Sequence, residues 1–293
     1  TAHKTQGQTY KMPMTITVDL RDVFESAQGY VMLGRPEKLE QLFIVEKVDE
    51  SKLYSDKKVR EEHEKMNKRS INENPQIWDK KNEKNIKICS LNCARLKPHI
   101  RDVQADYTIK KSDIIHLQET WIEETEENME MFNIPGYEVK HIKVGKGKGI
   151  TTYHSKSFIH VCDKVSQNYQ ITKYESKNVV SINVYRSAKG STDEIIDEIK
   201  KMQDEKKATI VTGDVNICAR KQHNNRLTQF MYDENFKLLT KTATHIKGGH
   251  IDHAYIKNAK ATLNLYTPYY SDHDALCVVV EEVWASGEWQ EPE

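Results

Sequence analysis

The chain has 293 residues, enough for one large domain or for one domain with appendages. Hydrophobic residues make up 37% of it and charged residues 30%, a balance typical of a packed core combined with solvated stretches. The 44 basic and 44 acidic side chains cancel, so no overall field draws the protein onto a polyanion. This counts against a sequence-independent DNA clamp and leaves open an enzyme whose charge is concentrated in one cleft.

The cysteines and the hydropathy of the chain indicate its compartment. Five cysteines, an odd number without a C-x-x-C pair, predict reduced thiols and not a disulfide framework. No stretch approaches the ~20 apolar residues of a membrane span, and no signal peptide opens the sequence. We therefore expect an intracellular protein that does not act at a membrane.

The first 84 residues differ from the rest in composition and in the pattern of their apolar residues. Residues 1–48 mix strand-like and helix-like segments, whereas residues 49–84 are rich in Lys, Glu and Asn and poor in apolar side chains. The second stretch predicts a charged linker. A basic arm for nucleic acid is the alternative, and the interspersed acids count against it.

From Asn85 onward, short β-rich runs recur. They are IKICSLN, DIIHLQETW, YEVKHIKV, GITTYH, VVSINVY, ATIVTGDVN, IDHAYI and DALCVVVEEV. Helical patterns occupy residues 192–207 and 225–235, and the first has acids in its first turn and lysines near its end. Because some strands are joined by hairpin-length loops and others by helices, the sequence predicts a layered, mixed α/β domain.

Polar residues stand at the ends of several of these strands. They are Asn92, Glu119, Asp214, Asn216, Asp252, His253, Asp272 and His273. Each alone is more typical of a turn or an N-cap. Because the strands share sheets, however, we expect the side chains to converge on one rim.

A rim of this kind suits hydrolysis of a phosphodiester. Carboxylates hold a hard cation, which neutralises charge on the phosphoryl oxygens. A further acid activates water, and a histidine or amide donors contact the non-bridging oxygens. The sequence therefore predicts a metal-dependent phosphodiesterase site.

The order of the motifs resembles the endonuclease/exonuclease/phosphatase superfamily. The matching motifs are LN, LQET, NVYRS, TGDVN, IDH and SDH, within residues 85–283 and together with the Gly-rich hairpin GKGKGITTYH. The resemblance implies a four-layer α/β/β/α sandwich of two mixed β-sheets with helices outside. It also implies that Glu119 and Asn92 bind Mg²⁺ (or Mn²⁺), with Asp272 helping from the other side.

The remaining roles follow from the same resemblance. Asp214 would activate the attacking water, and Asn216 would position it. His273 would contact the phosphate and be held by Asp252. Two further contacts to the phosphate or DNA would come from Tyr185 and Arg186. The alternative for Tyr185 is an aromatic side chain buried in its sheet.

Residues that are missing from the motifs reduce the number of possible substrate classes. Inositol phosphatases of this superfamily carry a Pro-Ala-Trp-Cys-Asp-Arg block where this chain has GGHIDHAYI, and abasic-site enzymes carry an aromatic residue where it has Gly249. The segment most resembles endonuclease modules of mobile elements. We therefore expect DNA to be cut in an open groove, leaving a 3′-hydroxyl and a 5′-phosphate.

Residues 1–48 resemble the last two motifs of superfamily-1 DNA helicases of the Helitron type. The matching stretches are TAHKTQGQT and QGYVMLGR, although Gly34 replaces the usual Ser before Arg35. No Walker loop, G-x-x-x-x-G-K-[ST], occurs in the chain, so we expect a helicase remnant that uses no ATP. The alternative is an unrelated short α/β segment. The whole would be a monomeric, nuclear protein of a Helitron-like transposon, with residues 284–293 as a tail.

Three alternatives remain open on the sequence alone. One is a phosphatase of small or lipid phosphates, and another is a non-catalytic transposon remnant. A zinc site at His245, His250 and His253 is disfavoured, because no Cys or further His supplies a spaced fourth ligand.

Overall fold

The structure is a computed structural model that describes residues 9–23, 28–47, 49, 57–58, 61, 77–78, 85–219 and 226–284. The chain divides into two compact units, Thr1–Pro75 and Gln76–Glu293. The first eight residues of the helicase-like motif, most of the predicted linker and nearly all of the predicted tail lie outside the described residues. Among the residues described, none of the helices combines the length and apolar character needed to cross a membrane.

The first unit contains a small parallel strand pair. Strand β1 (Ile16–Val18) lies beside β2 (Leu42–Ile44), and α2 (Gln28–Leu33) and the short 3-10 helix η1 (Leu39–Gln41) lie between them in the chain. A parallel pair needs such a crossover connection. The side chain of Gln41 is fully buried and donates to the carbonyls of Tyr10 and Met14. The helicase ancestry of this unit stays a prediction.

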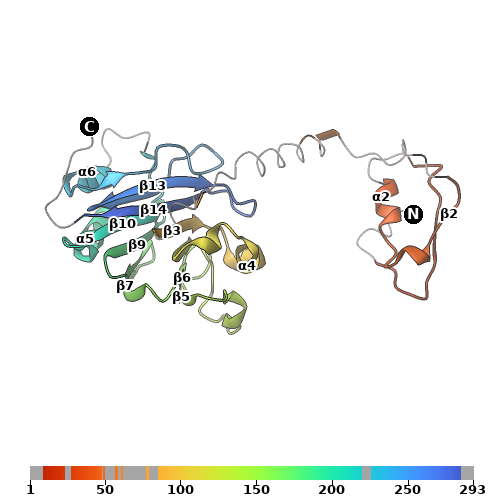
Figure 1. The fold of residues 1–293 in the computed structure, drawn as a ribbon, viewed down its shortest axis with the longest axis horizontal. Coiled ribbons are helices and arrows are strands. Elements are labelled where there is room, and N and C mark those ends of the chain that lie inside the picture. The colour runs from red at the N-terminus through yellow and green to blue at the C-terminus, as the bar shows by residue number, and fades with distance from the viewer. Residues whose placement is uncertain are drawn as a thin grey trace. The chain divides into compact units, whose positions relative to one another are not determined.

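The second unit contains two six-stranded mixed sheets (Figure 1). The first sheet has the order β13-β14-β3-β4-β6-β5 and the second β11-β12-β10-β9-β8-β7. The strands of the first sheet are β3 (Ile86–Asn92), β4 (Ile114–Gln118), β5 (Glu138–Ile142), β6 (Ile150–His154), β13 (Ala259–Tyr266) and β14 (Ala275–Val283). Those of the second are β7 (Ile159–Val165), β8 (Tyr169–Glu175), β9 (Val179–Arg186), β10 (Ala208–Asp214), β11 (Lys237–Leu238) and β12 (Asp252–Lys257).

Helices cover the outer faces of both sheets, and Figure 1 shows α5 and α6 at one side of this unit and α4 at the other. Their bounds are α4 (Leu96–Ala105), α5 (Thr192–Met202) and α6 (Arg226–Asp233), with 3-10 turns η4 (Ile109–Lys111) and η5 (Met129–Phe132). Leu96, Ile100 and Val103 of α4 pack into a core with the first sheet. The apolar sides of α5 and α6 pack on the second sheet, and a separate apolar core lies between the sheets. The predicted four-layer α/β/β/α sandwich is confirmed.

Polar side chains also join the two sheets across their interface. His116 of β4 contacts the Thr152 hydroxyl at 3.1 Å and the Ser181 hydroxyl of the second sheet at 2.8 Å. Burial lowers the pKa of His116 to about 3, so its imidazole is neutral at physiological pH. Gln118 donates to Ser90 and, across the interface, to Asn183. These bonds fix how the sheets lie against each other, next to the strand ends that carry the predicted site.

Candidate active site

Both sheets contribute strand ends to one rim. In the second sheet, Asp214 at the end of β10 is paired with Tyr185 of β9 on one side and with Asp252 of β12 on the other. In the first sheet, Asn92 ends β3 and is paired with Gln118, so Glu119 follows directly. Strand register therefore places five of the predicted residues in two short rows, although they are far apart in the sequence.

A hydrogen bond between Asn92 and Asp214 joins the two rows. Asn92 Nδ2 donates to Asp214 Oδ2 at 2.9 Å, and Asn92 Oδ1 accepts from the backbone N–H of Ala94 at 3.0 Å. The backbone N–H can only donate, which fixes the orientation of the amide. Asn216 binds the same carboxylate through its backbone N–H at 2.9 Å and its Nδ2 at 3.2 Å. Asp214 is thus held in one position by two asparagines.

The residue before Asp214 must be glycine. Gly213 has a φ of +138°, and a Cβ at this position would lie 1.9 Å from the carbonyl oxygen of Val184 on the neighbouring strand. A side chain is excluded both by this contact and by the backbone conformation. The Thr-Gly-Asp sequence therefore lets β10 lie close to β9 just before it presents the carboxylate.

His273 is held by a buried carboxylate. Its Nδ1 lies 2.9 and 3.1 Å from the two oxygens of Asp252, and the Thr244 hydroxyl donates to Asp252 at 2.6 Å. His273 and Asp252 are both buried. Because Nδ1 is used by Asp252, the other ring nitrogen, Nε2, is the one that can meet a substrate. The predicted His273–Asp252 pair is thus present in the structure, while its role in a reaction stays a prediction.

Burial and neighbouring charges shift the pKa values of the site residues. Burial and the neighbouring charge of Asp252 raise the pKa of Asp214 to about 8. Burial disfavours charged His273, but the hydrogen bond and charge of Asp252 outweigh it and raise the pKa of His273 to about 9. At neutral pH and without a metal, His273 is therefore an imidazolium and Asp214 is mostly protonated; a bound cation would favour the charged carboxylate of Asp214.

Glu119 and Tyr185 meet at the Gly-rich hairpin. The Tyr185 hydroxyl donates to the Gly147 carbonyl at 2.9 Å, and Trp121 Nε1 lies 3.4 Å from Glu119 Oε2. Burial and the charges of Glu119 and Asp214 raise the pKa of Tyr185 well above its usual value. The phenol of Tyr185 therefore stays protonated and able to donate a hydrogen bond, as the predicted phosphate contact requires. Tyr185 is also largely buried, as the alternative interpretation expected, and its contact with a phosphate stays a prediction.

Asp272 lies on the exposed side of the rim. Its carboxylate is 3.4 Å from His245 Nε2, and the ring of His245 packs edge-on against His273 with 4.6 Å between centroids. Backbone bonds hold the two loops together, with Ile246 N–H donating to the Asp272 carbonyl. Asp272 is accompanied by His245, a histidine that the motifs did not assign to the site, and its predicted role as a metal ligand stays a prediction.

Arg186 has a structural role that was not predicted. Its Nε donates to the Gly190 carbonyl and its Nη1 to the Val215 carbonyl, each at 3.0 Å. The side chain is buried, and its backbone carbonyl accepts from Asn216 Nδ2 at 2.8 Å. Arg186 thereby fixes the loop that follows Asp214. Its predicted contact with DNA stays a prediction.

The donor set of the rim fits a divalent cation. Among the described residues, the ligand atoms of Asp214, Asp252 and His273 lie within 4.8 Å of one another, as do those of His245, Asp272 and His273. Three of these five residues are aspartates, and neither group includes Glu119 or Asn92, so the predicted ligand set of Glu119, Asn92 and Asp272 stays a prediction. Hard oxygen donors suit Mg²⁺ or Mn²⁺ better than a soft metal. A cation there would also offset the repulsion between the buried Asp214 and Asp252.

No family model matches the chain, and its sequence matches no curated protein. Solved structures do match its fold. A 3′-5′ exonuclease from Neisseria meningitidis is 17% identical over 68% of this chain and 100% of its own, with a TM-score of 0.51. The endonuclease domain of TRAS1, a telomere-specific non-LTR retrotransposon, is 14% identical over 68% and 99%, with a TM-score of 0.53.

An AP endonuclease from Archaeoglobus fulgidus is 16% identical over 67% of this chain and 99% of its own, with a TM-score of 0.51. The fold is that of the endonuclease/exonuclease/phosphatase type. At these identities the likeness concerns the fold of the second unit alone. The endonuclease/exonuclease/phosphatase fold is shared by enzymes that act on different phosphates, so the function must be argued from the site.

Proposed function

We propose that the second unit is a divalent-metal-dependent endonuclease that hydrolyses phosphodiester bonds of DNA. The observation that carries this proposal is the junction of the two sheets, where Asn92 Nδ2 meets Asp214 Oδ2 at 2.9 Å beside the buried His273–Asp252 pair. A fixed carboxylate next to a charged imidazole is the arrangement that general base catalysis and phosphate binding require.

Each side chain has a role that follows from its contacts. Asp214 takes the proton of the attacking water, and Asn92 and Asn216 keep its carboxylate in place for this step. His273, charged at neutral pH and fixed through Nδ1, donates from Nε2 to a non-bridging oxygen. Tyr185, held protonated, donates to the phosphate after leaving the Gly147 carbonyl.

Glu119, Asn92 and Asp272 would hold Mg²⁺ or Mn²⁺. When bound, such an ion neutralises the charge that develops on the phosphoryl oxygens and the leaving oxygen. A φ of +50° at Glu119, directly after β4, supports a functional role for this residue. Non-glycine residues in this conformation are strained and are found preferentially at functional sites.

DNA is favoured over a small phosphate by the charge around the site. The hairpin from Lys143 to Lys148 carries three lysines, and its Gly147 carbonyl binds Tyr185. These lysines lie in the hairpin that contacts Tyr185, where they could meet the phosphates of a polyanion. One structure that matches the fold is described as a 3′ phosphatase from Neisseria bound to a product DNA hairpin, with a TM-score of 0.50.

The proposed setting is a Helitron-like mobile element, with the protein acting in the nucleus. Two observations support it. The helicase-like motifs lie within the first unit, which contains a parallel strand pair, and a retrotransposon endonuclease domain shares the fold of the second unit.

An end-labelled oligonucleotide assay tests the proposed reaction. With Mg²⁺ we expect internal cleavage of the oligonucleotide into fragments with 3′-hydroxyl and 5′-phosphate ends, which a ligase rejoins. Trimming from one end only would contradict an endonuclease. Release of inorganic phosphate from small or lipid phosphates without strand cleavage would identify a phosphatase instead.

A further inference from the structure

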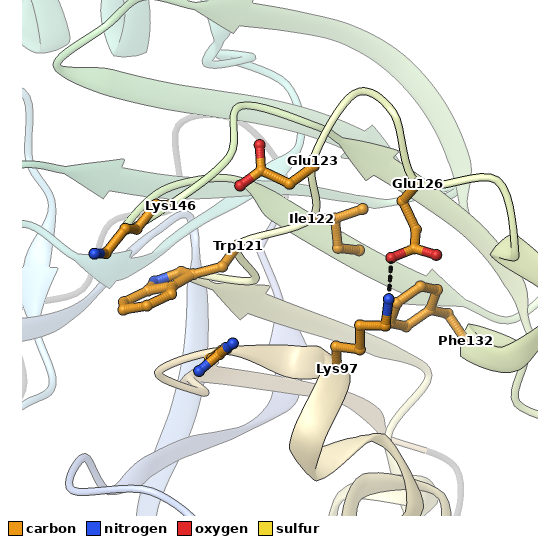
Figure 2. A pocket seen from close by; sticks show the side chains of 8 residues that line it. Lys97, Trp121, Ile122, Glu123, Glu126, Phe132 and Lys146 are labelled. Atoms are coloured by element: carbon orange, nitrogen blue, oxygen red, sulfur yellow. Dashed lines mark hydrogen bonds and ion pairs between the residues drawn. The ribbon is translucent and has the colours of Figure 1, made fainter.

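A pocket of about 580 Å³ is lined by Trp121 and the two residues at positions 122 and 123, which closely follow Glu119 in the chain (Figure 2). Trp121, Ile122 and Phe132 supply its apolar lining, and its charged lining comes from Arg95, Lys97, Glu123, Glu126 and Lys146. Pockets that hold one small group have this size and this mixture of apolar surface with a few polar groups. Of its lining residues only Lys146 was given a role above, as one of the three hairpin lysines.

The pocket is connected to the active site through Trp121. Trp121 Nε1 lies 3.4 Å from Glu119 Oε2, so the indole and the carboxylate are neighbours. An occupant on the indole would therefore lie next to the reacting phosphate. The half-buried ring leaves part of its surface open to the pocket.

The backbone around the pocket is strained and fixed. Ala94, Arg95, Glu119 and Trp121 have φ values of +43°, +99°, +50° and +54°, conformations that side chains other than glycine rarely adopt. Arg95 N–H donates to the Glu119 carbonyl at 2.8 Å, and Trp121 N–H to the Lys148 carbonyl at 2.9 Å. These bonds hold three loops together. A ring kept in place by this strain and bonding is preorganised for a ligand.

The charges of the lining suit an anion with a flat, apolar part. The exposed guanidinium of Arg95 lies 5.7 Å from the centroid of the Trp121 ring, and Lys146 is exposed beside it (Figure 2). Lys97 is paired with Glu126, and Glu123 is turned towards Gly145. The cations next to the indole are thus Arg95 and Lys146. An aromatic platform between basic side chains is how proteins bind unpaired bases together with their phosphates.

We propose that this pocket binds an unpaired base of the DNA strand next to the bond that is cut. The base stacks on Trp121, and Arg95 and Lys146 contact the phosphates that flank it. This inference rests on the proposed DNA substrate. A paired base is already stacked in its duplex and must be unpaired before it can enter, which costs free energy. The protein therefore prefers single-stranded DNA, or a strand with unpaired bases, over uninterrupted duplex.

Binding in the presence of EDTA tests the inference without any cleavage. Fluorescence anisotropy is measured with a labelled single-stranded oligonucleotide and with its duplex, for the full chain and for Trp121→Ala, Trp121→Phe and Tyr232→Ala. Base stacking on one aromatic ring predicts that Trp121→Ala weakens single-strand binding by about 5- to 150-fold and duplex binding much less. Tyr232→Ala, which changes an exposed ring on α6, should bind as the unchanged protein does.

The phenylalanine variant separates stacking from an effect on Glu119. It keeps a ring but loses the Nε1–H near the carboxylate, so it should retain most of the single-strand affinity. Replacing one base of the oligonucleotide with a base-free sugar, position by position, should reproduce the loss at one position and only with Trp121 present. Equal losses with single strand and duplex, no loss in Trp121→Ala, or tighter binding of RNA than of DNA would overturn the proposal.

The two proposals fail in different ways. If the protein cleaves DNA with Mg²⁺ but Trp121→Ala shows no selective loss of single-strand binding, the pocket is not a base site and the endonuclease stands. If the selective loss is present but the protein cleaves no DNA, the endonuclease fails while the base site remains.

Discussion

Replacing Asp252 with Asn removes the charge that keeps His273 protonated. The shift of the His273 pKa from its ordinary 6.5 to about 9 corresponds to about 3 kcal/mol, at roughly 1.4 kcal/mol per pKa unit. In Asp252→Asn the burial of His273 remains while its main partner charge is lost. We therefore expect the pKa of His273 to fall towards or below 6.5, which leaves the imidazole neutral at pH 7.5.

The pKa shift also sets the pH dependence of stability. Because the folded-state pKa of His273 is raised, the stabilisation is complete below pH 6.5 and is lost as the pH rises through about 9. The free energy of unfolding should thus differ most between the two proteins at pH 6 and less at pH 9.5. In the cleavage reaction, loss of the charged donor should lower kcat by about 100-fold at pH 7.5.

The assay is NMR titration of the His273 ring in metal-free buffer, combined with denaturant unfolding at both pH values. Asp233→Asn, a substitution of an exposed aspartate on α6, is the matched control. It should change neither the pKa of His273 nor the free energy of unfolding. A His273 pKa that stays near 9 in Asp252→Asn would refute the reasoning, because the charge would then come from elsewhere.

Three further predictions concern the strand ends and the cation. Gly213→Ala should destabilise the protein by at least about 3 kcal/mol, because its Cβ would lie 1.9 Å from the Val184 carbonyl oxygen; an unchanged Tm would contradict this placement. Asn92→Ala removes a donor to Asp214 and should lower kcat by about 10- to 100-fold with little change in KM; a change in KM alone would point to substrate binding instead. EDTA should abolish cleavage and added Mg²⁺ or Mn²⁺ should restore it, whereas cleavage that persists in EDTA would exclude the cation.

The strands that could be predicted from the sequence are those with continuous apolar runs. All eight predicted runs contain strands; seven of these strands lie inside the sheets, and the eighth, β5, is a partly exposed edge strand. Among the strands of the second unit, β7, β8, β11 and β13 were not predicted. In β7 and β13, which are sheet edges, charged and polar residues interrupt the apolar pattern, and β8 contains Lys and Glu. Helix α4 was also missed, since Pro98 breaks the expected pattern although proline is tolerated in a first turn.

The site was predictable as far as it consists of strand ends. The motifs predicted that Asp214, Asp252 and His273 belong together, and strand register brings them to one rim. The loop residues Thr244 and His245 were not assigned to that rim, because nothing in the sequence indicates that the loop before β12 folds against the one before β14. The pocket around Trp121 was missed for the same reason, since it is assembled from three separate loops.

Nicking of supercoiled plasmid DNA tests the central claim most directly. The protein is compared with Asp214→Asn in Mg²⁺, a substitution that keeps the size of a buried side chain bonded to Asn92 and Asn216 but removes its charge. We predict that the unchanged protein converts the plasmid to its nicked form and that Asp214→Asn is slower by about 100-fold or more, the scale of a lost general base. Intact plasmid with both proteins, or equal nicking by both, would contradict the account.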